Sequence, residues 1–393
     1  MIVQNKQRRR KSRIDPLKLT VLIVGVFGVI FLSSKTYTLA SSIIVSILKN
    51  GYASTTLSFT KPIYPKKVLD FAEYDLRMNH LAHKFDLNSA SSTESFKLSL
   101  LATSSASTTP LIKKATSTAD LWPVKKAAYP KAGAILPFKR VVAFYGNLYS
   151  KKMGVLGEYE PDEVLRKLQS QAKEWELADP ATPVQPALHY IAVVAQGSAG
   201  KDGMYRARMP DEQIEKVLEM AKKIDAIVFL DVQVALSDVQ KEIPLLEKYL
   251  IQPHVHLGID PEFSMKTGKK PGTVIGTMDA TDINFVASYL ATLVQKHDLP
   301  PKILTYYRFT RNMVTNYKNI KTIPEVQMVL TMDGWGHQAR KMGTYRAFIT
   351  PEPIQFAGFK IFYKNDLKQE GSRLMTPKEV IGLMPAPMYI QYQ

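Results

Sequence analysis

The chain of 393 residues contains no cysteine, and this absence excludes three kinds of chemistry. Without a thiol the protein has no disulfide, no cysteine nucleophile and no thiolate ligand for a metal ion. The absence leaves the compartment open, because a domain of this size buries enough apolar surface to be stable outside the cell without disulfides.

The large C-terminal part of the chain also lacks a marked excess of charge of one sign. The whole chain has 52 Lys and Arg against 35 Asp and Glu, a formal net charge of +17. Up to Leu136 there are 20 basic and 7 acidic residues, which leaves 32 basic and 28 acidic residues beyond it. A nearly balanced domain does not provide the basic surface that a nucleic-acid backbone requires, so nucleic acid is not expected as a partner.

The basic excess lies in an N-terminal arm, next to an apolar run. The sequence KQRRRKSR, Lys6 to Arg13, precedes LTVLIVGVFGVIFLSS at 19–34. Basic flanks of this kind stay in the cytoplasm, so the remainder of the chain is expected outside it, anchored to the membrane or secreted. The sequence predicts a basic arm at 1–16 and a membrane segment at 17–48. A retained transmembrane anchor and a cleaved signal peptide are both open, since small residues follow the run.

A segment rich in Ser, Thr and Ala follows the apolar run. Residues 88–119 contain little that a core would bury, and 68–85 are compatible with a short amphipathic helix. The sequence therefore predicts an extracellular linker or stalk at 49–136, and a folded domain at 137–393.

The folded domain alternates short apolar runs with charged helical patterns, which is typical of repeated β-strand and α-helix units. Eight strands are predicted, at 140–147, 188–196, 226–233, 254–260, 302–309, 326–333, 356–363 and 388–393. Helices are predicted at 161–176, 210–224, 237–250 and 279–297, with further ones near Asn312, His337 and Pro377. This pattern predicts a (β/α)8 TIM barrel. An open doubly wound sheet is the alternative, but no glycine-rich phosphate turn follows the first strand.

Polar residues stand at the C-terminal ends of the predicted strands, where barrels carry their functional groups. The sequence HVHLGIDPEF (254–263) is the most informative, because alternation directs Asp260 and Glu262 into the barrel mouth. The candidate catalytic carboxylates are Asp231, Asp260, Glu262 and Asp333. The candidate substrate-binding residues are Tyr145, Asn147, Gln196, Gln233, Tyr307, Arg308, Trp335, Tyr363 and Gln391.

Carboxylates on neighbouring strands suit the hydrolysis of glycosidic bonds, which uses two acids flanking the bond. Glu262 is the predicted general acid, because burial beside Phe263 would raise its pKa, and Asp260, Asp231 or Asp333 is the predicted partner. The aromatic residues among the binding candidates are expected to be exposed at the rim, where their rings would stack on sugars.

Two of these motifs carry a resemblance. The Asp-Pro-Glu that ends the fourth predicted strand resembles the Asp-x-Glu of chitinase-like glycoside hydrolases, and LTMDGWG at 330–336 resembles their Met-x-Tyr-Asp. That resemblance implies Glu262 as the acid and Asp260 as the residue that steers the substrate's acetamido group. The chain departs from the pattern, since Gly258 stands where the family has an Asp and no Trp ends the last strand. More broadly, 137–393 resembles the glycoside hydrolase-like TIM barrels of secreted or membrane-anchored bacterial proteins.

The candidate site residues could also have purely structural roles. Asp231 and Asp333 would also suit loop caps, Asp260 would also suit a turn enforced by Pro261, and Asp279 and Asp282 are expected to begin a helix. His254 and His256 lie at the start of a strand, so neither a metal nor a cofactor is expected.

The sequence predicts a glycoside hydrolase-like protein acting on a cell-wall or extracellular polysaccharide. A non-catalytic barrel that binds glycans or scaffolds the envelope is one alternative, and a different barrel hydrolase that uses a metal is another.

Overall fold

The computed structural model describes residues 68–84, 121–125 and 127–393, all of which belong to the compact unit Pro65–Gln393. The predicted basic arm, membrane segment and Ser/Thr-rich stretch lie outside the described residues. Within the described ranges no helix is both long and apolar enough to cross a membrane.

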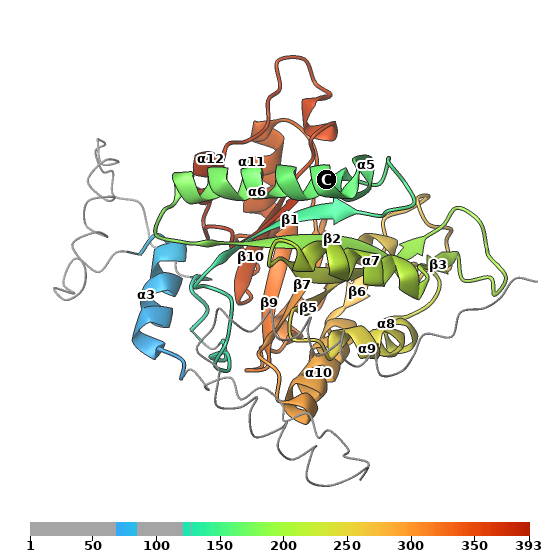
Figure 1. Cartoon of the computed structure of the whole chain (residues 1–393), viewed down its shortest axis with the longest axis horizontal. Helices are drawn as coiled ribbons and strands as arrows, with labels where there is room; N and C mark the ends of the chain where they lie inside the picture. The colour runs from blue at the N-terminus through green and yellow to red at the C-terminus, as the bar shows by residue number, and fades with distance from the viewer. Residues whose placement is uncertain (1–67, 85–120, 126) are drawn as a thin grey trace, which may run out of the picture. The chain divides into compact units, whose positions relative to one another are not determined.

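Eight parallel strands form a closed barrel (Figure 1), because β1 pairs with β2 on one side and with β11 on the other. In order around the barrel the strands are β1 (Arg140–Gly146), β2 (Val184–Ala195), β4 (Ile227–Val232), β5 (Val255–Ile259), β7 (Lys302–Arg308), β9 (Val326–Met332), β10 (Phe356–Ile361) and β11 (Tyr389–Tyr392). The eight predicted strands are all present, and closure of the sheet excludes the doubly wound alternative. The strands are buried almost throughout, as expected for parallel strands that contact helices on one face and the barrel interior on the other.

Three further strands lie outside the barrel ring. The strand β3 (Arg206–Arg208) runs antiparallel to the end of β2, and β6 (Met278–Asp279) pairs with β8 (Val314–Thr315). The first pair extends the loop after β2, and the second ties the loop after β5 to the loop after β7.

Helices follow most of the strands. They are α5 (Val155–Glu158), α6 (Pro161–Ala178), α7 (Asp211–Lys222), α8 (Val239–Glu242), α9 (Glu247–Leu250), α10 (Ala280–His297), α11 (Gln338–Phe348) and α12 (Pro377–Ile381). The predicted helix at 237–250 is interrupted at Pro244. Proline has no backbone N–H to donate to the preceding turn, and a 3-10 turn that begins at Pro244 separates α8 from α9. The predicted helix near Asn312 is wrong. Only the 3-10 turns Arg311–Met313 and Tyr317–Asn319 are found there, because β8 interrupts the segment.

The helix α3 (Phe71–Leu81) and the segment before Pro137 pack on the N-terminal end of the barrel. Tyr74, Met78 and Leu81 share an apolar cluster with Val141 of β1 and Phe356 of β10. The backbone oxygen of Leu81 accepts a hydrogen bond from Ala386 (2.7 Å). The described parts of the predicted linker are therefore packed against the barrel.

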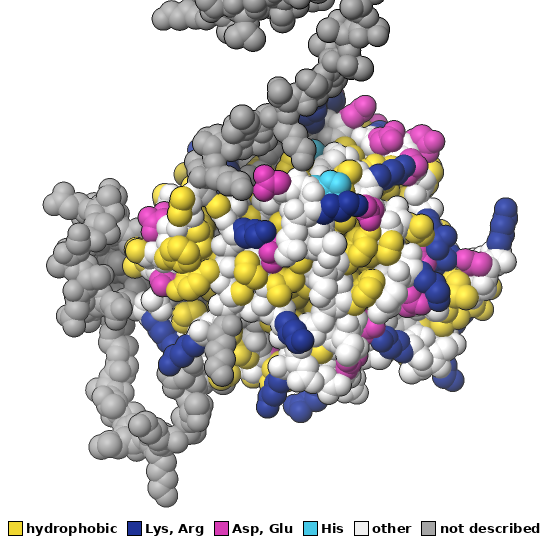
Figure 2. All heavy atoms as spheres, turned by 90° about the horizontal axis from the view of Figure 1, so that it is seen from below, with side chains coloured by type: hydrophobic (Ala, Val, Ile, Leu, Met, Phe, Trp, Pro, Cys, Tyr) yellow, Lys and Arg dark blue, Asp and Glu magenta, His cyan; other side chains and the backbone are white. Residues whose placement is uncertain are grey.

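Basic and acidic side chains are interspersed on the face of the molecule that Figure 2 shows. Figure 2 gives no continuous basic band on this face, which agrees with the nearly balanced charge of the sequence beyond Leu136.

Candidate active site

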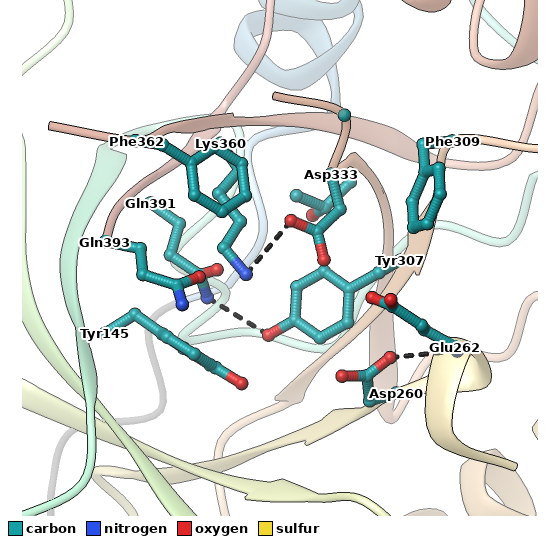
Figure 3. Close-up of polar contacts among 12 residues, drawn as sticks. Tyr145, Asp260, Glu262, Tyr307, Phe309, Asp333, Lys360, Phe362, Gln391 and Gln393 are labelled. Atoms are coloured by element: carbon teal, nitrogen blue, oxygen red, sulfur yellow. Dashed lines mark hydrogen bonds and ion pairs between the residues drawn. The ribbon is translucent and has the colours of Figure 1, made fainter. Parts of the chain in front are cut away.

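The C-terminal end of the barrel brings four predicted carboxylates into one polar cluster. Asp231 is the penultimate residue of β4, Asp260 and Glu262 follow β5, and Asp333 follows β9. In Figure 3 the side chains of Asp260, Glu262 and Asp333 lie around the ring of Tyr307, and Lys360 lies beside Asp333, across the ring from Asp260 and Glu262. The fold thus gathers residues that are more than 100 positions apart in sequence at one end of the strands, as the barrel reading predicted.

The two acids after β5 are held by a turn rather than by a continued strand. The strand ends at Ile259, and Pro261–Phe263 forms a 3-10 turn. The side chain of Asp260 caps this turn by accepting the backbone N–H of Glu262 (3.0 Å). The capping role considered for Asp260 is therefore present, and it fixes the direction in which Glu262 leaves the backbone.

Glu262 has the electrostatic environment of a proton donor. Burial raises the pKa of Glu262 to about 7, the carboxylate of Asp333 adds to the rise, and the ammonium of Lys360 opposes it. A carboxyl group with this pKa is partly protonated at neutral pH, and its proton is available for transfer.

Asp260 is more deeply buried than Glu262 and has few compensating donors. Burial raises the pKa of Asp260 well above its ordinary value, and the negative charge of Glu262 adds to the rise. Its second oxygen lies 3.3 Å from the amide nitrogen of Gln233. Both effects favour the protonated form of Asp260.

Lys360 is the residue of the cluster that the sequence reasoning missed. Its ammonium makes an ion pair with Asp333 (3.0 Å) and lies 4.2 Å from the ring centre of Tyr145 and 5.2 Å from that of Tyr307. Burial raises the pKa of Asp333, and this ion pair lowers it. The sequence did contain a signal for Lys360. Side chains alternate along a strand, so Lys360 lies on the same face as Gly358, and that face is directed into the barrel.

Asp231 is fully buried and accepts three side-chain hydrogen bonds. The donors are the hydroxyls of Tyr145 (3.0 Å) and Tyr307 (3.1 Å) and the Nε2 atom of His189 (3.1 Å). Burial lowers the pKa of His189, which favours the neutral ring, and the tautomer with its proton on Nε2 donates to the carboxylate and accepts from Tyr389 at Nδ1 (2.5 Å). These three hydrogen bonds give Asp231 a structural role, because they hold the side chains of Tyr145, His189 and Tyr307 in place.

Gly258 has no side chain and therefore leaves room for the hydrogen-bonded side chains of Asp231 and His189. A Cβ atom at Gly258 would lie 2.3 Å from an oxygen of Asp231 and 2.6 Å from Nε2 of His189. An aspartate, which chitinase-like enzymes have at this position, therefore does not fit here. This is the physical reason why the chain has glycine at 258 instead.

Replacing Gly258 with alanine is expected to lower the free energy of unfolding by about 1–3 kcal/mol, because a close-packed network has no room for the methyl group. Urea denaturation would measure the loss. Gly343→Ala in α11 is the matched control, since a Cβ there meets nothing within 4 Å. Equal stability of the two variants would contradict the assigned role of Gly258.

Several of the predicted binding residues are placed away from this cluster. Asn147 holds a turn, donating to the oxygen of Ile191 (3.0 Å), and Gln196 lies in the loop after β2. Arg308 pairs with Glu352 and donates to the backbone of the following loop, so it stabilises that loop. Gln233 and Gln391 do reach the cluster. The amide of Gln391 donates to the hydroxyl of Tyr307 (3.0 Å), and that of Gln233 approaches Tyr145 (3.4 Å).

The predicted exposed aromatic rim is largely wrong. Tyr145 and Tyr307 are buried within the hydrogen-bond network, and Tyr363 packs on Tyr392 with a ring distance of 5.1 Å. Trp335 is the exception, with 43 % of its surface exposed. Alternation along a strand predicts which side a ring faces, but the depth of that ring depends on strand tilt and on neighbouring loops, which the sequence does not specify.

His256 in β5 has a structural partner, whereas His254 lies exposed just before the strand. The Nδ1 atom of His256 accepts the backbone N–H of Ile303 (3.0 Å). Asp279 and Asp282 form a capping box that begins α10, as predicted. Among the residues that the structure describes, no group of three His, Asp or Glu side chains has an arrangement that would hold a metal ion.

No family model matches the chain, and no curated protein matches it. Among solved structures, mannanase man26 of Bacillus subtilis is similar over 65% of this chain and 79% of its own, with 11% identity and a TM-score of 0.35. Mannanase BCman of Bacillus subtilis is similar over 66% of this chain and 81% of its own, with 11% identity and a TM-score of 0.33. The assignment of the chain to the (β/α)8 barrels rests on its own strand pairing.

Proposed function

We propose that this protein is a glycoside hydrolase that acts on a cell-wall or extracellular polysaccharide, tethered to the membrane by its N-terminal segment. The observation that supports the chemistry is the convergence of Glu262, Asp260 and Asp333 at the C-terminal end of one barrel (Figure 3). Most glycoside hydrolases use two carboxyl groups that flank the glycosidic bond.

In this proposal Glu262 is the general acid and base. Protonated Glu262 transfers its proton to the glycosidic oxygen as the bond to the anomeric carbon breaks, and the leaving sugar departs as an alcohol. Asp333 is the partner carboxylate, because the ammonium of Lys360 at 3.0 Å favours its ionised form. Its negative charge stabilises the positive charge that develops on the sugar ring. Water then supplies the new hydroxyl group, and its other proton passes to the carboxylate of Glu262.

Asp260 orients the substrate and Glu262. It accepts the backbone N–H of Glu262, and burial raises its pKa well above the ordinary value, which favours a protonated form that can donate a hydrogen bond to a polar group of the sugar. Asp231 takes no direct part, because its oxygens already accept three hydrogen bonds.

A glycan-binding barrel without catalysis is the second candidate. The observation that favours it is the pairing of Asp333 with Lys360, since a lysine in contact with the second carboxylate reduces its nucleophilicity. The two candidates differ in whether bound polysaccharide is cleaved.

Incubating the full chain with a panel of cell-wall and capsular polysaccharides separates the two candidates. The proposal predicts new reducing ends with at least one polysaccharide. Retardation on glycan affinity gels without new reducing ends would support the binding barrel instead.

Replacing Asp333 with asparagine is expected to lower the pKa of Glu262 below about 7, because it removes a negative charge that raises this pKa and leaves Lys360 unopposed. Carbon-13 NMR titration of the Glu262 carboxyl group would measure the change without any need for activity. Asp162→Asn, at an exposed position on α6, is the control and should leave the pKa unchanged. A higher pKa in the Asp333 variant would contradict the assigned coupling.

A further inference from the structure

The charges around the mouth of the barrel are distributed unevenly, although the domain as a whole is nearly balanced. The loops and first helical turns that follow the C-terminal ends of the strands carry exposed basic residues with no carboxylate partner among the described residues. The main ones are Lys201 after β2, Lys269 and Lys270 after β5, and Arg340 and Lys368 after β9 and β10.

The acids in these same loops are mostly neutralised by ion pairs. Glu158 pairs with Lys364 (2.6 Å), Asp202 with Arg206 (2.8 Å), and Asp238 with Lys241 (2.7 Å). Glu160, Glu212 and Glu370 remain as exposed acids without an ion-pair partner among the described residues. The unpaired charge of the rim is therefore predominantly positive, while the centre contains the carboxyl groups of Asp260 and Glu262.

One side of the rim is organised around Trp335. The guanidinium of Arg340 lies 5.2 Å and the ammonium of Lys368 5.0 Å from its ring centre. Long basic side chains at a surface normally lose rotamer entropy when a ligand fixes them, so contact with an aromatic ring reduces that loss. These three residues form what we call the cation clamp.

The loop that carries Trp335 of the cation clamp is held by hydrogen bonds to buried side chains. The backbone N–H of Gly336 donates to Asp366 (2.9 Å), and the oxygen of Gly334 accepts from Lys341 (3.0 Å). Lys341 and Asp366 are buried and form an ion pair (2.9 Å). The backbone on both sides of Trp335 is therefore fixed from below, which holds the clamp in position beside Asp333.

The other side of the rim lies across β7 from the clamp. Lys269 and Lys270 follow β5, and a Cβ atom at Gly197 would lie 4.0 Å from the Cε atom of Lys270, so the loops after β2 and β5 meet there. Glu262 and Asp333 come from β5 and β9, the strands from which the two sides of the rim extend.

We infer that the barrel mouth binds a saccharide chain that carries anionic groups, carboxylate or phosphate, on the sugars flanking the one at its centre. The anionic groups contact Lys269 and Lys270 on one side and the cation clamp on the other, and an uncharged linkage lies over Glu262. A nucleic acid fits this pattern poorly, because its closely spaced phosphates would also lie over the central carboxyl groups. The inference deepens the proposed function, since it names the substrate class of the same site.

Calorimetric titration of the full chain carrying Glu262→Gln tests this inference separately from cleavage. The probes are hexagalacturonate and its methyl ester, and mannohexaose with and without phosphate groups. In about 50 mM salt each charged oligosaccharide is expected to bind about tenfold tighter than its neutral counterpart, and the difference should shrink at about 300 mM salt. A gain for one charged probe alone identifies carboxylate or phosphate as the recognised group.

The double variant Lys269→Gln and Lys270→Gln, and separately Trp335→Ala, should each lose most of the preference for the charged probes. Lys173→Gln with Lys216→Gln on the outer faces of α6 and α7 makes the same change in net charge and should lose none of it. Equal binding of charged and neutral probes would overturn the inference, as would an equal loss in the control or tighter binding of a DNA hexamer.

The two proposals fail in different ways. Tight binding of charged oligosaccharides without cleavage of any polysaccharide by the wild-type chain would overturn the hydrolase and support the cationic rim. Cleavage of neutral polysaccharides, with no preference for charged probes, would do the reverse.

Discussion

Replacing Glu262 with glutamine is expected to reduce turnover of a cleaved polysaccharide about 10²- to 10⁴-fold, the usual contribution of a positioned general acid. Glutamine keeps the size and polarity of the side chain but has no proton to transfer to the leaving oxygen. Affinity for the polysaccharide should change little, so the loss is expected in kcat and not in KM. Initial rates of reducing-end release at a range of polysaccharide concentrations would separate the two constants.

The matched control is Glu215→Gln on the exposed face of α7. It makes the same chemical change far from the carboxyl cluster, and its kcat should equal that of the wild type. A Glu262 variant that keeps most of its turnover would remove Glu262 from the catalytic role.

Replacing Asp231 with alanine is expected to lower the free energy of unfolding by about 3–5 kcal/mol. The substitution leaves three buried donors, on Tyr145, His189 and Tyr307, without their acceptor, and each costs about 1–3 kcal/mol if no other acceptor is found. Urea denaturation followed by tryptophan fluorescence would measure this loss, because Trp122 and Trp175 are buried.

Two comparisons make the Asp231 result specific. Asp231→Asn keeps one carbonyl acceptor and is expected to cost less than the alanine variant. Asp162→Ala removes a surface ion pair with Lys223 and should change the stability by at most about 1 kcal/mol. A loss for Asp231→Ala no larger than this would show that the buried network does not stabilise the barrel.

The barrel itself could be predicted because its strands are short apolar runs separated by helical patterns, and each run is buried on both faces. The same alternation predicted that Asp231, Asp260 and Glu262 would meet at one end. The 3-10 turn at Pro261 could be suspected from the proline alone. The missing helix near Asn312 had no comparable signal, because the pairing of β8 with β6 depends on a partner 36 residues earlier.

The finer arrangement of the site depends on contacts between distant residues. Lys360 neutralises Asp333 only because β10 lies next to β9, and the burial of Tyr307 depends on His189 and Gln391 from other strands. Side-chain depth and ion pairing are properties of the closed barrel, so a single sequence predicts the candidates more reliably than the partner of each.

The most direct test is the pH dependence of kcat/KM for reducing-end release by the full chain, measured for the wild type and for Glu262→Gln on the same polysaccharide. Glu262 must be protonated to act as the acid, and its pKa is raised to about 7. The account predicts that wild-type activity falls as the pH rises through about 7, and that this fall is absent from the residual activity of the variant. An alkaline fall that persists unchanged in Glu262→Gln would contradict the account.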